Sequence, residues 1–157
     1  GALAGRFAAE RARGSRPMPA CAGKAKPPDR PDRPGSMADY RAIRKLLGGA
    51  AWNGAGIVRA EGPMRAALSS LGEMEGQLDR MAPRTVPERL LENDLRSGIL
   101  TLRAILQAGI GRQESRGSFL RSDHPNQDDE GWRRNSCLTY DETSRGFAVG
   151  YCPVEGA

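Results

Sequence analysis

A chain of 157 residues has the length of one ordinary domain, but its 20 glycines, 11 prolines and 5% aromatic residues predict that only part of it packs into a core. Its net charge of +5 arises within residues 11–36, and the remainder of the sequence is neutral. A nucleic-acid-binding domain would concentrate basic side chains on its folded part, so this distribution argues against nucleic acid as a partner.

The N-terminal third contains two kinds of segment. Residues Gly1–Arg13 are predicted to form a short helix with Leu3 and Phe7 on one side and small residues along another, suited to packing closely against a larger body. Residues 14–36 carry six prolines among basic and small residues, which predicts an extended basic linker rather than a helix.

A Ser36-x-x-Asp39 capping pattern predicts the start of the first bundle helix. That helix carries Tyr40, Ile43, Leu46, Leu47 and Trp52, and we expect Gly48 and Gly49 to interrupt it. Just beyond it, Ile57 and Val58 are expected to pack in the core together with Trp52, because large apolar side chains are usually buried.

Two further helices follow at regular apolar spacing. Pro63 suits the first turn of a helix whose apolar stripe comprises Met64, Ala67, Leu68, Leu71, Met74, Leu78 and Met81. After a breaker at residues 82–87, the longest helix is predicted over about Glu88–Gln113, with a stripe of Leu91, Leu95, Ile99, Leu102, Leu106 and Ile110. The predicted fold is mainly α, a three-helix antiparallel bundle over residues 37–115.

The C-terminal residues predict a β-hairpin, Ser136–Tyr140 paired with Phe147–Cys152. Opposing Tyr140 to Phe147 collects one apolar face, which should lie on the bundle or on a partner: Leu138, Tyr140, Phe147, Val149 and Tyr151. Cys137 and Cys152 become diagonal neighbours on the other face, where a disulfide is conceivable. An odd cysteine count, with Cys21 the third, and no secretory leader favour free thiols instead.

Between helix and hairpin, residues 114–133 form a run of charged, hydroxyl, amide, Gly and Pro residues, which we call the signature loop. Arginine side chains can hold carboxylates or phosphates through two hydrogen bonds, so the loop could bind a ligand. A surface turn whose charges pair with one another or with water is the simpler interpretation. His124 is the only histidine and the cysteines lack a C-x-x-C pair, so no metal site is predicted.

The spacing of this loop resembles the C-terminal signature of succinate dehydrogenase and fumarate reductase flavoproteins and of their relative L-aspartate oxidase, R-x-E-S-R-G-x-H-x-R-x-D-x-P-x-x-D-D-x-x-W. The matching residues are Arg112, Glu114, Ser115, Arg116, Gly117, Arg121, Asp123, Pro125, Asp128, Asp129 and Trp132. Phe119 replaces the histidine of the pattern, and His124 stands where the family has Phe or Tyr. Residues 52–59 similarly resemble the family segment M-W-x-x-V-G-I-x-R.

The resemblance implies the C-terminal helical domain of an FAD-dependent dicarboxylate oxidoreductase. Residues 1–13 would be the trailing helix of an FAD-binding domain, and residues 116–157 the signature loop and hairpin. The family's substrate and catalytic residues would precede this segment, so no catalytic, cofactor-binding or metal-binding residue is expected here, and FAD would belong to the parent enzyme. The candidate domain-interface or loop-fixing residues are Arg112, Glu114, Ser115, Arg116, Arg121 and Asp123.

The expected partners are the FAD-binding domain of the same protein and an iron–sulfur subunit, without nucleic acid or direct membrane insertion. The implied location is cytoplasmic, peripheral at the inner face of a membrane through other subunits. Two alternatives stay open: an L-aspartate oxidase C-terminal domain, and a stand-alone helical module that binds another protein.

Overall fold

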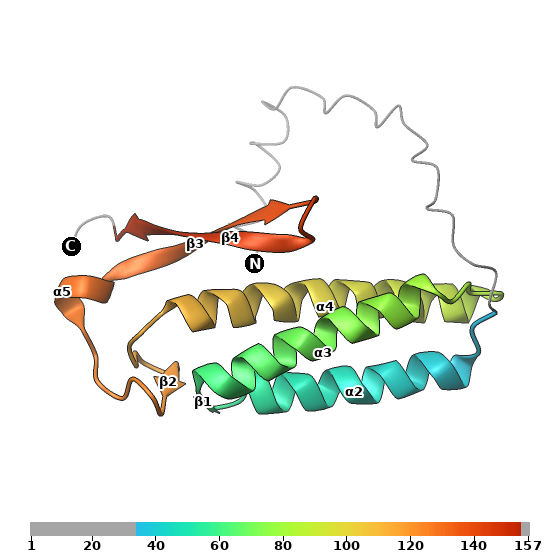
Figure 1. Ribbon diagram of the computed structural model, residues 1–157, viewed down its shortest axis with the longest axis horizontal. Coiled ribbons are helices and arrows are strands. Elements are labelled where there is room, and N and C mark those ends of the chain that lie inside the picture. Colours follow the sequence, from blue (N-terminus) through green and yellow to red (C-terminus); the bar gives the residue numbers. More distant parts are fainter. Residues whose placement is uncertain (1–33, 155–157) are drawn as a thin grey trace, which may run out of the picture.

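Three long helices form an antiparallel bundle in the computed structural model, which describes residues 34–154. They are α2 (Met37–Ala55), α3 (Glu61–Asp79) and α4 (Val86–Gly111). Successive helices lie side by side and run in opposite directions (Figure 1). The predicted bundle is therefore confirmed. The predicted helix over 1–13, most of the linker over 14–36, and Cys21 lie outside the described residues.

The core lies along the line where the three helices meet. Residues three or four apart share one face of a helix, and each helix turns such a face inward. The predicted stripes of α3 and α4 supply most of the buried apolar side chains, which are Tyr40, Ile43, Met64, Ala67, Leu71, Met74, Leu78, Met81, Leu95, Ile99, Leu102 and Leu106. The methionines act as flexible filler among the leucines.

Side-chain caps fix where the helices begin. The predicted capping box of α2 is present, with the Ser36 amide donating to the Asp39 carboxylate at 2.9 Å. A second box opens α4, where the Thr85 amide donates to the Glu88 carboxylate at 3.0 Å. Because Thr85 is the cap, α4 begins two residues before the predicted start at Glu88 and ends at Gly111.

Two expectations for the first bundle helix are wrong. α2 continues through Gly48 and Gly49 to Ala55, because a glycine lowers helix propensity by only about 1 kcal/mol and tertiary packing compensates. The three residues expected in the core are instead exposed, Trp52 by 73%, Ile57 by 70% and Val58 by 62%. Trp52 lies nine residues beyond the buried Ile43, which places it about 180° around the helix.

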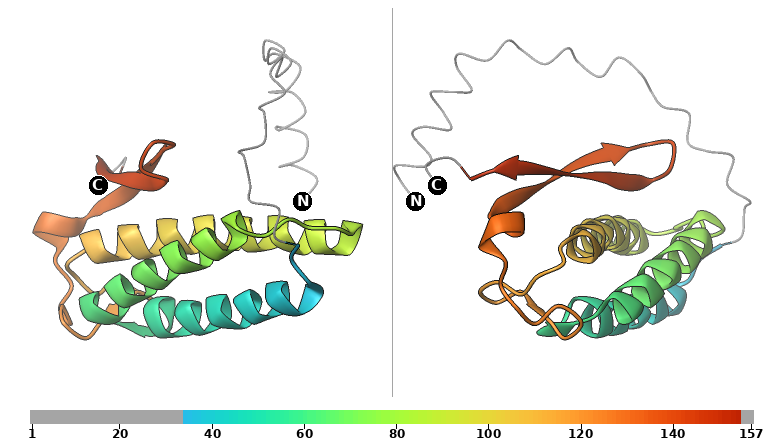
Figure 2. Two further views of the ribbon diagram at one scale, coloured as in Figure 1. Left: turned by 45° about the vertical axis from the view of Figure 1, so that its right-hand side comes forward. Right: turned by 60° about the vertical axis from the view of Figure 1, so that its left-hand side comes forward.

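The predicted C-terminal hairpin is present as β3 (Arg134–Asp141) and β4 (Gly146–Pro153), with the expected pairs Tyr140–Phe147 and Leu138–Val149. It lies alongside α4, on the side away from α2, in both views of Figure 2. The Phe147 amide donates to the Gln107 side chain of α4 at 3.0 Å. At the turn of the hairpin, Arg145 pairs with Asp79 of α3 at 2.9 Å.

The two hairpin cysteines correct the expectation of free thiols. Cys137 and Cys152 are diagonal neighbours, as predicted, and they form a disulfide with their Cα atoms 6.5 Å apart. This separation lies within the range that a disulfide can bridge, and pairing of these two residues does not depend on the total number of cysteines.

Two short elements link the bundle to the signature loop. β1 (Val58–Arg59), directly after α2, pairs in parallel with β2 (Leu120–Arg121) at one end of the bundle, as Figure 1 shows. The loop then forms α5 (Asp129–Trp132) before entering β3. Within residues 34–154, no helix has the length and hydropathy needed to cross a bilayer.

Candidate functional site

The signature loop leaves the C-terminal end of α4 and is shaped by two tight local structures. Its first turn joins Arg116 and Phe119 through reciprocal backbone hydrogen bonds of 2.8 and 3.0 Å. Gly117 in this turn has φ +58°, a left-handed conformation that glycine adopts without a steric penalty. Further along, the Asp128 carboxylate accepts from the Gly131 amide at 2.8 Å and caps α5. These turns bring residues far apart in the loop together.

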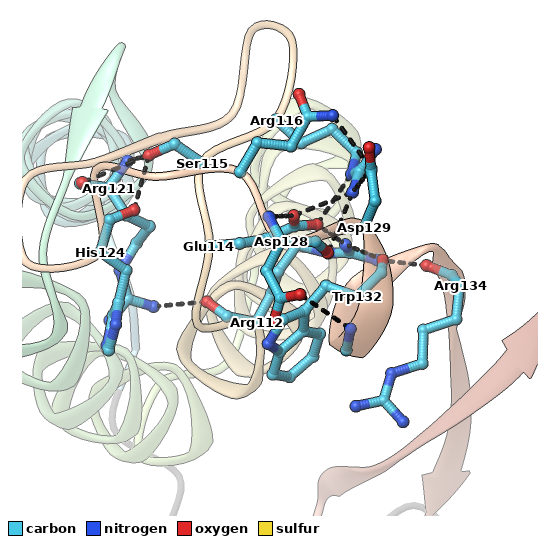
Figure 3. Close-up of polar contacts among 12 residues, drawn as sticks. Arg112, Glu114, Ser115, Arg116, Arg121, His124, Asp128, Asp129, Trp132 and Arg134 are labelled. Carbon is cyan, nitrogen blue, oxygen red and sulfur yellow. Dashed lines mark hydrogen bonds and ion pairs between the residues drawn. The ribbon is translucent and has the colours of Figure 1, made fainter.

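Glu114 is the fully buried centre of the first half of the loop. Its carboxylate accepts hydrogen bonds from Arg112, from Arg116 at 2.9 and 3.0 Å, and from the Asp128 amide at 3.0 Å. Figure 3 shows the two guanidinium groups converging on it. Burial by itself would raise the pKa of Glu114, but the hydrogen bonds from Arg116, the Asp128 amide and Arg112 outweigh burial and lower it.

The two arginines that hold Glu114 also connect it to the rest of the loop. Arg116 donates to Asp129 at 2.7 Å, and its hydrogen bonds to Glu114 and Asp129 raise the pKa of its guanidinium. Arg112 donates to the backbone oxygen of Trp132 at 3.0 Å and lies over the indole ring, 5.6 Å from its centroid. The buried carboxylate is thereby joined to α5 and to the start of the hairpin.

Arg121 and Asp123 form a second pair in the other half of the loop. Arg121 is 1% exposed and donates to both Asp123 oxygens, at 2.6 and 2.7 Å. It also donates to the backbone oxygens of Gly109 and Arg112, which satisfies carbonyl groups at the end of α4. The hydrogen bond from Arg121 holds the pKa of Asp123 well below its usual range, and the Glu61 amide at the start of α3 supports this at 2.8 Å.

Ser115 connects two segments of the loop through its buried hydroxyl. The hydroxyl accepts from the Arg121 amide at 2.8 Å and donates to the His124 backbone oxygen at 2.8 Å. His124 is half-buried, and the hydrogen bonds that position it here are made by its backbone. All six candidate residues from the sequence therefore lie in one contiguous network, organised around Glu114 and around Arg121.

The sequence assigned no role to Arg59 or Phe119, which meet beside this network. The Arg59 guanidinium lies over the Phe119 ring, 4.9 Å from its centroid. The only signal in the sequence was that Arg59 is the last residue of the segment 52–59 that resembles the family. That position does not indicate what the Arg59 side chain contacts.

The chemistry available to the network is the mutual neutralisation of its charges. The guanidinium groups of Arg112, Arg116 and Arg121 are each engaged with carboxylates of the same loop. In the part of the chain that the structure describes, no group of three His, Cys, Asp or Glu side chains is placed to hold a metal ion. The arginines and carboxylates of this network are thus paired within the loop itself.

Comparison with known proteins matches residues 44–157 to the family described as "Fumarate reductase flavoprotein C-term". A fumarate reductase flavoprotein subunit of Mycobacterium tuberculosis is 42% identical over 59 residues, which cover 37% of this chain and 10% of that protein. An L-aspartate oxidase of Pyrococcus horikoshii is 35% identical over 89 residues, covering 57% of this chain and 14% of the relative.

A solved structure shares the fold at lower sequence identity. A mutant of the E. coli quinol fumarate reductase chain FrdA superposes with a TM-score of 0.72 at 19% identity, over 82% of this chain and 22% of that one. The chain thus spans between a tenth and about a quarter of the length of each of these proteins.

Proposed function

The chain belongs to the family of fumarate reductase flavoprotein C-terminal domains, and we propose on that basis that it is the helical domain of an FAD-dependent dicarboxylate oxidoreductase, packing against the flavin-binding part and not catalytic by itself. The observation that carries the proposal is the internal pairing of the signature loop. Recognition of a dicarboxylate requires cationic groups that are open to the substrate. Arg116 and Arg121 of the loop are instead held by its carboxylates, Glu114, Asp129 and Asp123.

The described residues do not fit the dinucleotide part of FAD. A dinucleotide cradle needs a strand, a glycine-rich turn and a helix N-terminus in succession. β1 runs almost directly into α3, but Ala60 is the cap and the turn has no glycine. The proposal therefore assigns FAD to the remainder of the parent protein and gives this chain the task of covering and rigidifying that part.

The candidate site residues have a structural role in this proposal. Hydrogen bonds of Arg112, Glu114 and Arg116 join the end of α4 to α5 and β3. Those of Arg121 and Asp123 join α4 to α3. A loop fixed from both sides presents a constant surface to a neighbouring domain. The flavin-binding domain is the proposed first partner, and an iron–sulfur subunit of the same assembly is the second. The parent assembly is placed in the cytoplasm, peripheral at the inner face of a membrane.

The reading frame that encodes Gly1 provides a direct test. An upstream segment with G-x-G-x-x-G after a strand is expected, and the full polypeptide should purify with bound FAD and reduce or oxidise a dicarboxylate. The 157-residue chain mixed with FAD should retain no flavin after gel filtration and show no turnover. Flavin retention or turnover by the chain alone would overturn the proposal, and an unrelated upstream domain would instead favour a protein-interaction module.

The L-aspartate oxidase relative supports a second candidate substrate for the parent protein. Assays of the full polypeptide with succinate, fumarate and L-aspartate, with a dye as electron acceptor or donor, distinguish the two. Activity confined to L-aspartate would assign the domain to that branch.

A further inference from the structure

Large apolar side chains are exposed together at the end of the bundle that carries β1 and β2. We call this the Trp52 patch, and it consists of Trp52 (73% exposed), Ile57 (70%), Val58 (62%) and Leu120 (41%). Three of these side chains line a groove of about 580 Å³, whose other walls include Ala51, Ala55 and Arg59. Exposed apolar side chains that cluster in this way mark surfaces that contact another molecule.

The patch is held rigid by the signature loop. Val58 pairs with Leu120 in the β1–β2 ladder, and the Ser122 amide donates to the Arg59 oxygen at 2.9 Å. The Glu61 amide, two residues beyond Arg59, donates to Asp123 at 2.8 Å. Asp123 is in turn held by the buried Arg121. The ion pairs of the loop thus fix the backbone that carries the exposed apolar side chains.

A cation without a carboxylate partner lies in the wall of the same groove. Arg59 stacks on Phe119 and reaches the Ala55 oxygen at 3.4 Å, while its Nε is buried without a hydrogen-bond acceptor. Among residues 34–154, no ion pair joins Arg59 to an acidic side chain, whereas Arg112, Arg116 and Arg121 each have one. The Arg59 side chain as a whole is only half-buried, so a carboxylate from outside the domain can pair with its charge through the guanidinium N–H groups that remain accessible.

We propose that the Trp52 patch and Arg59 form the docking surface for the flavin-binding part of the same polypeptide, which contributes an apolar segment with one carboxylate that pairs with Arg59. This inference rests on the proposed function. More than three quarters of the similar fumarate reductase chain lies outside the matched domain, so a domain of this kind has a large covalently linked neighbour. The unpaired positive charge in an apolar groove specifies the chemistry of the segment that covers it.

Hydroxyl-radical labelling of the full polypeptide, read residue by residue by mass spectrometry, tests the surface with an internal control. Trp52 is 73% exposed and Trp132 is half-buried in the domain, so an uncovered patch labels faster at Trp52. Docking reverses this order, and Ile57 should likewise label more slowly than Leu90, which is 60% exposed on α4. Faster labelling at Trp52 in a polypeptide that carries FAD overturns the docking surface. A polypeptide without flavin contradicts the proposed function itself.

Variants of the full polypeptide test the carboxylate. Arg59→Gln should increase Trp52 labelling on the order of tenfold, whereas Arg65→Gln, in an exposed ion pair on α3, should leave it unchanged. Ile57→Ser gives a second variant that removes apolar contact from an exposed position, with Val86→Ser as its match on α4. Thermal unfolding checks that each variant folds. Wild-type labelling in folded Arg59→Gln overturns the carboxylate pairing, and wild-type labelling in folded Ile57→Ser overturns the apolar contact.

Discussion

Glu114 carries the charge on which the first half of the signature loop depends. A fully buried carboxylate is tolerated only when donors surround it, and Arg112, Arg116 and the Asp128 amide provide them. The pair between Glu114 and Arg116 is therefore a condition for the loop conformation. Removing one member of such a pair leaves the other charge desolvated and unpaired.

Substituting Glu114 should consequently be far more damaging than its position in a loop between helix and hairpin suggests. Glu114→Gln keeps the shape but removes the counter-charge of two arginines, and we expect the free energy of unfolding to fall by about 3 kcal/mol. Glu130→Gln, an exposed carboxylate on α5, is the matched control and should change it by less than about 0.5 kcal/mol. Urea unfolding followed by circular dichroism measures both, and equal midpoints would show that Glu114 is not structural.

At this scale the sequence located the charged residues but could not assign their partners. The spacing of Arg112, Glu114 and Arg116 predicted either an interface or internal pairing. Which of these applies depends on the turn at Gly117 and on α5, which bring Asp128 and Asp129 back to Arg116. Those contacts span twelve and thirteen residues and have no periodic signal in the sequence.

At the scale of the element, α2 and α3 approach each other closely at Gly54. A Cβ atom built on Gly54 would lie 2.6 Å from the Ala67 Cβ and 3.0 Å from a Leu106 methyl group. Gly49, one and a half turns earlier on α2, faces open space, where a Cβ meets nothing within 4 Å. Packing between the helices therefore requires a glycine at position 54 but not at position 49.

Alanine substitutions at these two glycines should change stability in opposite directions. Gly54→Ala overpacks the contact between the helices and should lower the free energy of unfolding by about 2 kcal/mol. Gly49→Ala replaces a residue of low helix propensity without creating a clash, and should raise the free energy of unfolding by up to about 1 kcal/mol. Thermal unfolding of the two variants compares them directly. A stabilised Gly54→Ala variant would show that the helices can separate at this point without cost.

Helices were predictable here because they have long apolar stripes and caps, and the ends of α4 were wrong by only two residues. β1 and β2 could not be predicted, because strands of two residues are too short to show an alternating pattern of apolar and polar residues and their partners lie about sixty residues apart. The burial of Trp52 was predicted from its residue type. Its angular position, opposite Ile43 on α2, already placed it outside the core.

At the scale of the whole molecule, charged contacts that cross between elements join the parts that the structure describes. Arg145 at the hairpin turn pairs with Asp79 of α3, and Arg103 of α4 pairs with Glu75 at 2.8 Å. Together with the hydrogen bond from the Glu61 amide of α3 to Asp123 of the loop, these contacts join the hairpin, the loop and the bundle. Their carboxylates must stay ionised for the arrangement to persist, which couples the fold to pH.

The free energy of unfolding should therefore decrease in acid, because several carboxyl groups have a lower pKa in the folded chain than in the unfolded one. Hydrogen bonding from Arg121 lowers the pKa of Asp123, and the pKa values of Glu114 and Asp79 are also lowered in the folded chain. The unfolded chain, with ordinary carboxyl pKa values of about 4, takes up protons first as the pH falls. The contribution of these groups is fully present above that range and is lost as the pH falls through their folded pKa values.

Asp123→Asn isolates one of these contributions. The variant should be less stable than the wild type at pH 7. The difference in urea midpoint should shrink progressively below about pH 4, because Asp123 of the unfolded wild type takes up a proton there and the advantage of the ion pair declines. Asp94→Asn removes an exposed carboxylate of α4 and should give a curve parallel to the wild type. A difference between Asp123→Asn and the wild type that stays constant from pH 7 to pH 3 would mean that the Arg121–Asp123 pair does not link loop stability to ionisation.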